Sequence, residues 1–151
     1  MKLEKQFSVF MINKPGVLAN VLGEIATSKV NILAMTMMDS MEHGVLRVVS
    51  TDAEKTKAIL TKLNMPFSET DILCLTLSNK PGALAEVAEK LAKNHINITY
   101  AYCTAGAWGG KATGIVKVAD LNKAMKILAT NGEHDSARSK PQVRRSLSTR
   151  R

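Results

Sequence analysis

An internal repeat is the feature that most constrains how this 151-residue chain can fold. The tetrapeptide Asn-Lys-Pro-Gly stands at residues 13–16 and again at residues 79–82, and neighbouring residues agree at the same spacing. Later in each copy, residues 44–49 match residues 114–119 after a short insertion. Self-similarity of this kind indicates one structural unit built twice. The repeat therefore predicts two similar small modules in tandem.

Each copy has a pattern of alternating strands and helices. Short apolar and β-branched runs predict the strands, and apolar stripes at helical spacing predict the helices. The first copy is expected to contain strands at 7–12, 30–38, 45–50 and 67–70, one helix from Val17 and another from the cap residue Asp52 to Leu63. The second is expected to contain strands at 72–77, 96–103 and 113–118 and helices at 82–93 and 121–129.

This order predicts an α+β fold of two tandem ferredoxin-like (βαββαβ) modules, each an antiparallel sheet with its helices on one face. The expected division is residues 1–70 for the first module, 71–131 for the second and 132–151 for a basic, disordered tail. Nothing strand-like follows the last helix, so the second module is expected to lack its final strand. In the strand order 4-1-3-2, that loss would leave Ile72 to Leu77 as an unpaired apolar edge, covered by a partner or a tail segment.

The Asn-Lys-Pro-Gly turn has a direct chemical use at the start of a helix. The free N–H groups of a helix N-terminus attract a carboxylate, and a glycine lets a ligand approach the backbone closely. A single turn of this kind is equally compatible with a structural turn that binds nothing. Its occurrence twice, each time followed after the helix by an Asn that opens the next strand, favours a binding site.

At these residues the sequence resembles the ACT domain family of small-molecule sensors. The matching segments are Asn13-Lys14-Pro15-Gly16-Val17-Leu18 with Val30-Asn31-Ile32, and Asn79-Lys80-Pro81-Gly82-Ala83-Leu84 with Ile96-Asn97-Ile98. The resemblance covers residues 7–131 and is closest to tandem ACT proteins without a catalytic domain. It implies an amino-acid ligand held where two modules meet. The implied contacts are Asn13, Gly16, Val17, Leu18, Asn31, Ile32, Asn79, Gly82, Ala83, Leu84, Asn97 and Ile98.

The resemblance also implies a function and a ligand class. Serine-sensing members have a His two residues before the turn Asn, where this chain has Met11 and Leu77, so an apolar or aromatic amino acid is expected instead. The implied protein is a homodimeric sensor that allosterically regulates a separate metabolic enzyme and is not itself an enzyme. No catalytic set, cofactor or metal site is predicted.

Charge and aromatic content bear on a nucleic-acid alternative. The formal charge is +8, and residues 132–151 hold six Lys or Arg against two acids, so half of it lies in the tail. An RNA-binding domain of the RRM type has the same element order but needs aromatic residues on its central strands, and the run at 45–49 has none. A basic nucleic-acid-associated protein that uses its tail remains the alternative.

Other motifs favour structural roles. The segment around Trp108 lacks the residues of a phosphate-binding loop and is expected to be a hairpin loop, with Trp108 as an interface contact, a ligand cover or an exposed tip. Alternation along a strand sends Met37 and Met38 to opposite faces, so the methionines between residues 35 and 41 are expected to pack rather than bind metal. Cys74 and Cys103 are expected to be reduced thiols, and the absence of a signal or membrane span predicts a cytoplasmic location.

Overall fold

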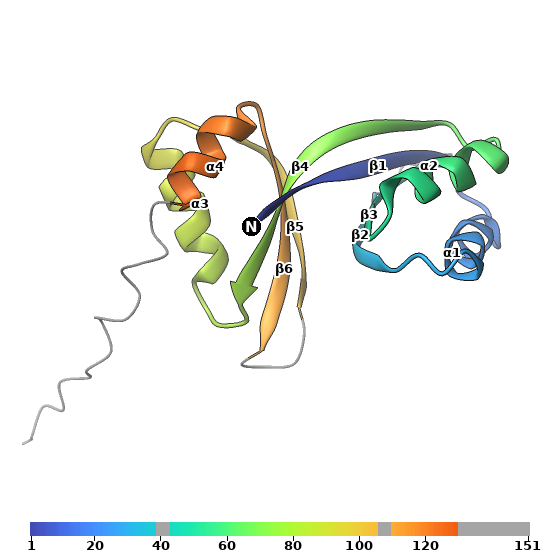
Figure 1. Ribbon diagram of the computed structural model, residues 1–151, viewed down its shortest axis with the longest axis horizontal. Coiled ribbons are helices and arrows are strands. Elements are labelled where there is room, and N and C mark those ends of the chain that lie inside the picture. The colour runs from blue at the N-terminus through green and yellow to red at the C-terminus, as the bar shows by residue number, and fades with distance from the viewer. Residues whose placement is uncertain (39–42, 106–109, 130–151) are drawn as a thin grey trace, which may run out of the picture.

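A computed structural model describes residues 1–38, 43–105 and 110–129 of the chain (Figure 1). Strands and helices alternate in the predicted order. The strands are β1 (Lys2–Ile12), β2 (Ile32–Met38), β3 (His43–Ser50), β4 (Phe67–Ser78), β5 (Ile98–Ala105) and β6 (Lys111–Val118). The helices are α1 (Val17–Thr27), α2 (Ala53–Lys62), α3 (Ala83–Lys93) and α4 (Leu121–Ala129). No helix in the described part of the chain is long and apolar enough to cross a membrane.

All six described strands form a single antiparallel sheet in the order β2-β3-β1-β4-β6-β5. β1 and β4 are the two central strands and pair along residues 2–9 and 67–74. Read outward from this pair, the first half has the order β4-β1-β3-β2 and the second half has the order β1-β4-β6-β5. Each half therefore shows the ferredoxin-like arrangement, and β1 and β4 belong to both halves.

This sharing corrects two sequence expectations. The segments at 67–70 and 72–77 form one continuous strand, β4, which runs through the expected module boundary. The prediction that Ile72 to Leu77 form an unpaired edge is wrong for residues 72–74. These residues pair with Glu4, Leu3 and Lys2 of β1. On its other side, β4 pairs with β6 from Leu73 onward. The beginning of β1 thus stands where the second module would need its last strand.

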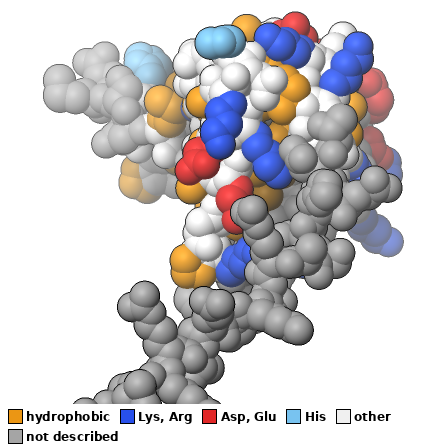
Figure 2. All heavy atoms as spheres, turned by 90° about the vertical axis from the view of Figure 1, so that its left-hand side faces the viewer, with side chains coloured by type: hydrophobic (Ala, Val, Ile, Leu, Met, Phe, Trp, Pro, Cys, Tyr) orange, Lys and Arg blue, Asp and Glu red, His pale blue; other side chains and the backbone are white. Residues whose placement is uncertain are grey.

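The helices of both halves cover the same face of the sheet. Phe7 belongs to the first core, and Leu3 pairs with Leu73 of the second core. Phe7 and Leu3 are four residues apart on β1 and therefore point to the same face of the sheet. The face that α1 and α2 cover in one half thus continues as the face that α3 and α4 cover in the other. The outer surface on the side of α3 and α4 carries lysines interspersed with acidic residues (Figure 2). The caps of α2 and α4 are equivalent, because Asp52 accepts from the N–H of Lys55 and Asp120 accepts from the N–H of Lys123.

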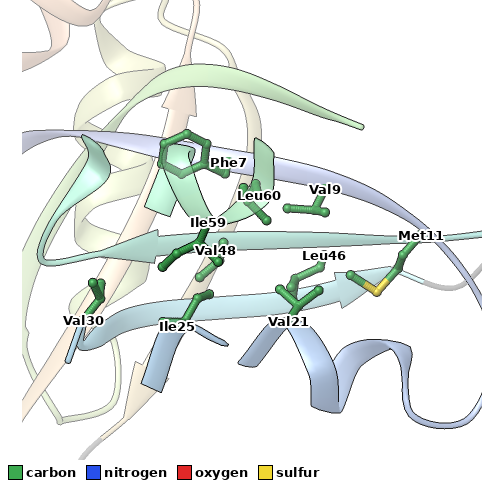
Figure 3. Close-up of a cluster of buried hydrophobic side chains, with 10 residues drawn as sticks. All are labelled: Phe7, Val9, Met11, Val21, Ile25, Val30, Leu46, Val48, Ile59 and Leu60. Carbon is green, nitrogen blue, oxygen red and sulfur yellow. The ribbon is translucent and has the colours of Figure 1, made fainter. Parts of the chain in front are cut away.

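Two apolar cores lie between the sheet and its helices. The first packs β1 and β3 against α1 and α2, as the close-up in Figure 3 shows for Phe7, Val21, Leu46 and Leu60. The second packs β4 and β6 against α3 and α4 around fully buried Leu91. Burying large aliphatic side chains in this way stabilises each by about 1.5–3 kcal/mol. The predicted helical stripes therefore do face the sheet.

The opposite face of the sheet curls into a concave surface. A third apolar cluster lies there, with Ala34 and Val49 from the first half and Ile72 and Ile115 from strands that build the second. β2 and β5, the two edges of the sheet, approach one another across this surface. The two halves are therefore joined by packing as well as by shared strands.

Candidate functional site

The two Asn-Lys-Pro-Gly turns have nearly the same backbone geometry. Gly16 has φ +90° and Gly82 has φ +89°, a left-handed conformation that glycine adopts without a Cβ penalty. The N–H of Val17 donates to the carbonyl of Lys14 at 3.3 Å, and the N–H of Ala83 donates to the carbonyl of Lys80 at 3.4 Å. A proline followed by a left-handed glycine inside such a bond is typical of a type II turn. The repeated tetrapeptide therefore specifies how each helix begins.

Each turn delivers the chain directly into a helix N-terminus. Among the described residues no side chain caps α1 at Gly16 or α3 at Gly82. The first N–H groups of a helix have no acceptor within the helix, and they carry partial positive charge. The two sites differ in charge, because the first turn of α1 has no acidic residue whereas that of α3 contains Glu86. The start of α1 is therefore the better place for a carboxylate.

A pocket of about 460 Å³ opens beside the first of these turns. Val17 at the start of α1 forms one wall, and the others come from the end of β1, the start of β3 and the loop between α2 and β4. Its lining residues are Phe10, Met11, Ile12, Val17, His43, Asn64, Met65 and Pro66. Volumes of this size and mainly apolar linings are usual for small-molecule sites.

The second half has a smaller hollow that is lined by the middle of α3 rather than by its start. It measures about 160 Å³ and lies between the end of β4, α3 and α4, with Leu77, Val87 and Leu128 among its walls. Met1 and Lys90 also line it. The two turns are therefore alike, whereas the hollows of the two halves differ in size and in their position along the helix.

The apolar residues predicted to contact a ligand are partly structural. Val17, Leu18 and Ile32 are partly buried against the first core, and Ile98 is partly buried against the second. Leu84 is 38% exposed at the start of α3. Only Val17 also lines the larger pocket.

The predicted polar residues occupy different positions. The side chains of Asn31 and Asn97 are exposed, and the backbone of Asn31 bonds to Thr51 at the end of β3. Asn13 is exposed and Asn79 half-buried in their turns, and both make interactions with their surroundings. These four residues therefore mark the turns and the strand starts, as the repeat pattern predicts.

Within one module, the turn and the second strand do not come together. Ile12, just before the first turn, pairs with His43, whereas Ile32 pairs with Ser50 at the other end of β3. α1 separates the two places along its length, which is roughly 16 Å for its 11 residues. The set of predicted contacts therefore splits into two groups at opposite ends of the helix.

Sequence reasoning missed most of the pocket walls. His43, Asn64, Met65 and Pro66 lie in or beside loops, and no repeat or motif singles them out. The sequence indicates only that Phe10 and Ile12 belong to a strand, whereas in the structure they are 46% and 52% exposed. Large apolar side chains at that exposure are a signal that only the structure supplies.

Several sequence predictions lie outside the described residues. Trp108 and its loop, Met41 and the basic tail at 132–151 all fall there. Within the described part, Cys74 is half-buried and Cys103 exposed, and both are free thiols. Burial, and secondarily the charge of Glu4, raises the pKa of the Cys74 thiol above its ordinary value.

The fold and turns define the chain as a tandem pair of ferredoxin-like modules with a ligand-sized pocket at one helix start. Residues 1–135 match a family model described as an ACT domain pair. The chain belongs to this ACT domain family. No protein of curated function matches the sequence.

Solved structures agree with the family. Protein BT0572 from Bacteroides thetaiotaomicron superimposes with a TM-score of 0.78 at 27% identity, covering 85% of this chain and 88% of that one. The regulatory subunit of aspartate kinase from Thermus thermophilus gives 0.63 at 11% identity, covering 86% and 97%. The corresponding subunit from Thermus flavus gives 0.56 at 16% identity, covering 85% and 93%. The latter two show a shared fold, and the family supports a regulatory role with a small-molecule ligand.

Proposed function

We propose that this chain is an amino-acid sensor that allosterically regulates a separate metabolic enzyme, and that it has no catalytic activity of its own. The observation that carries the proposal is the pocket of about 460 Å³ beside the uncapped start of α1. A helix N-terminus recognises a carboxylate, and apolar walls accept an apolar or aromatic side chain. The regulatory subunits of aspartate kinase with the same fold support this role. We place the protein in the cytoplasm, where such an enzyme would be found.

A second copy of the chain would complete the site. β2 is an edge strand of the described sheet, and edge strands readily pair with another strand. In an antiparallel pairing of two β2 strands around a two-fold axis, the start of one strand lies beside the end of the other. Asn31 and Ile32 of the second copy would then approach the turn at 13–16 of the first. This arrangement unites the two groups of residues that one chain keeps apart.

The proposed site belongs to the first module. Its turn lacks an acidic neighbour in α1, whereas Glu86 would repel a carboxylate at the start of α3. The pocket of the first module is also the larger of the two. We therefore assign the amino-acid ligand to Asn13, Gly16 and Val17, with Asn31 and Ile32 from the second copy.

A thermal-shift screen of the twenty amino acids, followed by calorimetric titration of the best one, tests the proposal. Gly16→Asp places a negative charge where the ligand carboxylate would lie and should abolish binding. Gly16→Ala has the same backbone strain without the charge, and its added Cβ would meet no atom within 4 Å, so it should retain most of the affinity. Gly82→Asp makes the equivalent change in the second module and should leave the affinity unchanged.

Two further results bear on the composite site. Asn31→Ala removes one neutral hydrogen bond and should weaken binding about fivefold, which corresponds to about 1 kcal/mol. Sedimentation should show a dimer that the amino acid stabilises. A folded Gly16→Asp variant that binds as tightly as the parent protein would contradict the assignment of the ligand to this turn.

A further inference from the structure

The concave face of the sheet holds a second pocket, which joins the two modules and shares only Phe10 with the pocket beside the first turn. It measures about 360 Å³ and draws its walls from β1, β2 and β3 on one side and from β4, β5 and β6 on the other. Arg47 of β3 and Lys117 of β6 both line it. This brings two cations from the two copies of the repeat, at positions that the repeat itself aligns, to one cavity.

The acidic residues of β4 point away from this pocket. Asp71 forms an ion pair with Lys5 at 2.8 Å, and Glu69 forms one with Lys57 of α2 at 2.6 Å, both on the face covered by the helices. Alternation along the strand leaves Ser68 and Thr70 facing the concave side. Among the described residues no carboxylate lines the pocket, and neither Arg47 nor Lys117 has an ion-pair partner. Within the described part of the chain the pocket is therefore positive, with no carboxylate to balance its two cations.

The two cations are held in place by contacts with other parts of the chain. The Arg47 guanidinium stacks on the ring of Tyr100 with its central carbon 3.9 Å from the ring centroid. The Lys117 ammonium donates to the backbone carbonyl of Asp71 at 3.1 Å. Neither contact uses all the donors of its group, since a guanidinium has five and an ammonium three. Both cations can therefore donate to a ligand without first being reorganised.

A buried hydrogen-bond network holds Tyr100 in place. Its hydroxyl accepts from the side-chain amide of Gln6 at 2.7 Å, and Gln6 in turn accepts from the hydroxyl of Tyr102 at 3.0 Å. Gln6 is completely buried. This network ties β1 of the first module to β5 of the second at the floor of the pocket, so a ligand there would contact a rigid junction.

The rim of the pocket is apolar. Phe10 and Met38 are 46% and 47% exposed, and Val45 of β3 pairs with both of them. A ligand that fits must therefore combine an anionic end with an apolar body. Because Arg and Lys recognise both carboxylate and phosphate oxygens, the shared chemistry is that of an oxyanion.

We propose that the concave pocket binds a small molecule with an oxyanion head group, which Arg47 and Lys117 hold, and an apolar body, which packs on Phe10 and Met38. This ligand contacts both modules at once. Arg47 and Lys117 do not line the pocket at the start of α1, so their variants test this proposal independently of the amino-acid site.

Titration of the full chain with three probes of similar shape tests this proposal. Phenylacetate carries a carboxylate, phenyl phosphate carries a phosphate, and phenylacetamide is uncharged. At least one of the two anions should bind saturably, and the one that binds more tightly identifies the head group. Phenylacetamide should bind at least tenfold more weakly, because it lacks the charge-assisted hydrogen bonds.

Three variants locate the binding. Arg47→Gln and Lys117→Gln should each weaken anion binding by about tenfold or more, because each removes one charge-assisted contact. Lys62→Gln removes the same charge from α2, where Lys62 contacts Glu24, and should have no effect. Melting curves establish that the variants are folded, and shifts of backbone amide signals at Ser8, Ser68 and Thr70 report occupancy directly.

The outcomes that would overturn the proposal are specific. They are an absence of saturable binding of either anion at millimolar concentration, equal affinity for phenylacetamide, or equal weakening by Lys62→Gln. Loss of anion binding in Gly16→Asp but not in Lys117→Gln would instead assign the anion to the turn. Salt should weaken the binding, but the loss should be modest compared with that expected for a nucleic acid that contacts many phosphates.

Discussion

Single residues decide how tightly the two modules are joined. Gln6 is a buried polar side chain whose oxygen accepts from Tyr102 and whose nitrogen donates to Tyr100, so its hydrogen-bonding groups are satisfied in the apolar interior. Burial, together with the neighbouring Tyr100, raises the pKa of Tyr102 well above its ordinary value near 10. The neutral hydroxyl is thus part of the folded state.

Tyr102→Phe should destabilise the protein by about 1–3 kcal/mol at neutral pH, because it leaves the oxygen of Gln6 buried without a donor. The pKa of Tyr102 is higher in the folded than in the unfolded chain, so the stability that it contributes is complete below about pH 10 and is lost as the pH rises further. The gap in melting temperature between parent and variant should therefore narrow above pH 10. A gap that stays constant to pH 11 would contradict this role for the hydroxyl.

Sequence reasoning at the residue scale succeeded where local chemistry decides the outcome. The turn glycines and the cap Asp52 follow from backbone geometry, which a short motif specifies. Gln6 could not be recognised, because a glutamine beside Lys5 has the composition of an exposed segment. Its partners lie 94 and 96 residues away, and only tertiary structure brings them together.

At the scale of elements, two glycines at helix α1 differ in backbone conformation. Gly16 precedes the helix with φ +90°, whereas Gly23 lies within the helix at an ordinary φ. An added Cβ would meet no atom within 4 Å at either position. Any difference between their alanine variants must therefore come from the backbone.

Gly16→Ala should destabilise the chain by about 1–2 kcal/mol, the cost of a left-handed conformation for a residue with a Cβ. Gly23→Ala should stabilise it by roughly 0.5–1 kcal/mol, because alanine loses less backbone entropy in a helix interior. Urea unfolding of the two variants measures both effects. Equal changes of the same sign would show that the positive φ of Gly16 does not constrain the turn.

The limits of two strands, β1 and β4, could not be predicted from the sequence pattern. The start of β1 at Lys2 was not predicted, because residues 2–6 are mostly polar and carry no apolar alternation. Their strand conformation comes from pairing with the middle of β4 rather than from their own propensity. For the same reason the sequence predicts two strands, 67–70 and 72–77, where the structure has the single strand β4, because the polar run at 68–71 gives no sign that the strand continues.

At the scale of the whole molecule, the shared central strands make the two modules one cooperative unit. Leu60 is fully buried in the core of the first half and Leu91 in that of the second. A disturbance in either core reaches β1 and β4, which both halves need. The repeat predicted two modules but not this dependence, because it arises from pairing between the copies.

Leu60→Ala and Leu91→Ala should each lower stability by about 2–5 kcal/mol, the usual cost of a cavity in a packed core. Calorimetry should show one transition in the parent and in both variants, with equal calorimetric and van't Hoff enthalpies. Amide exchange in the unmutated half should accelerate as much as in the mutated half. Two separate transitions, with only one displaced by each variant, would show that the halves unfold independently.

The pairing of β1 with β4 also has a consequence for the ancestry of the chain. The first strand of each copy runs antiparallel to that of the other, so an approximate two-fold axis passes between them. A protein with one copy of the repeat would form this contact only by meeting a second molecule, and its strength would depend on concentration. Duplication in tandem converts that encounter into an intramolecular one. It also frees each copy to diverge, as the unequal pockets of the two halves illustrate.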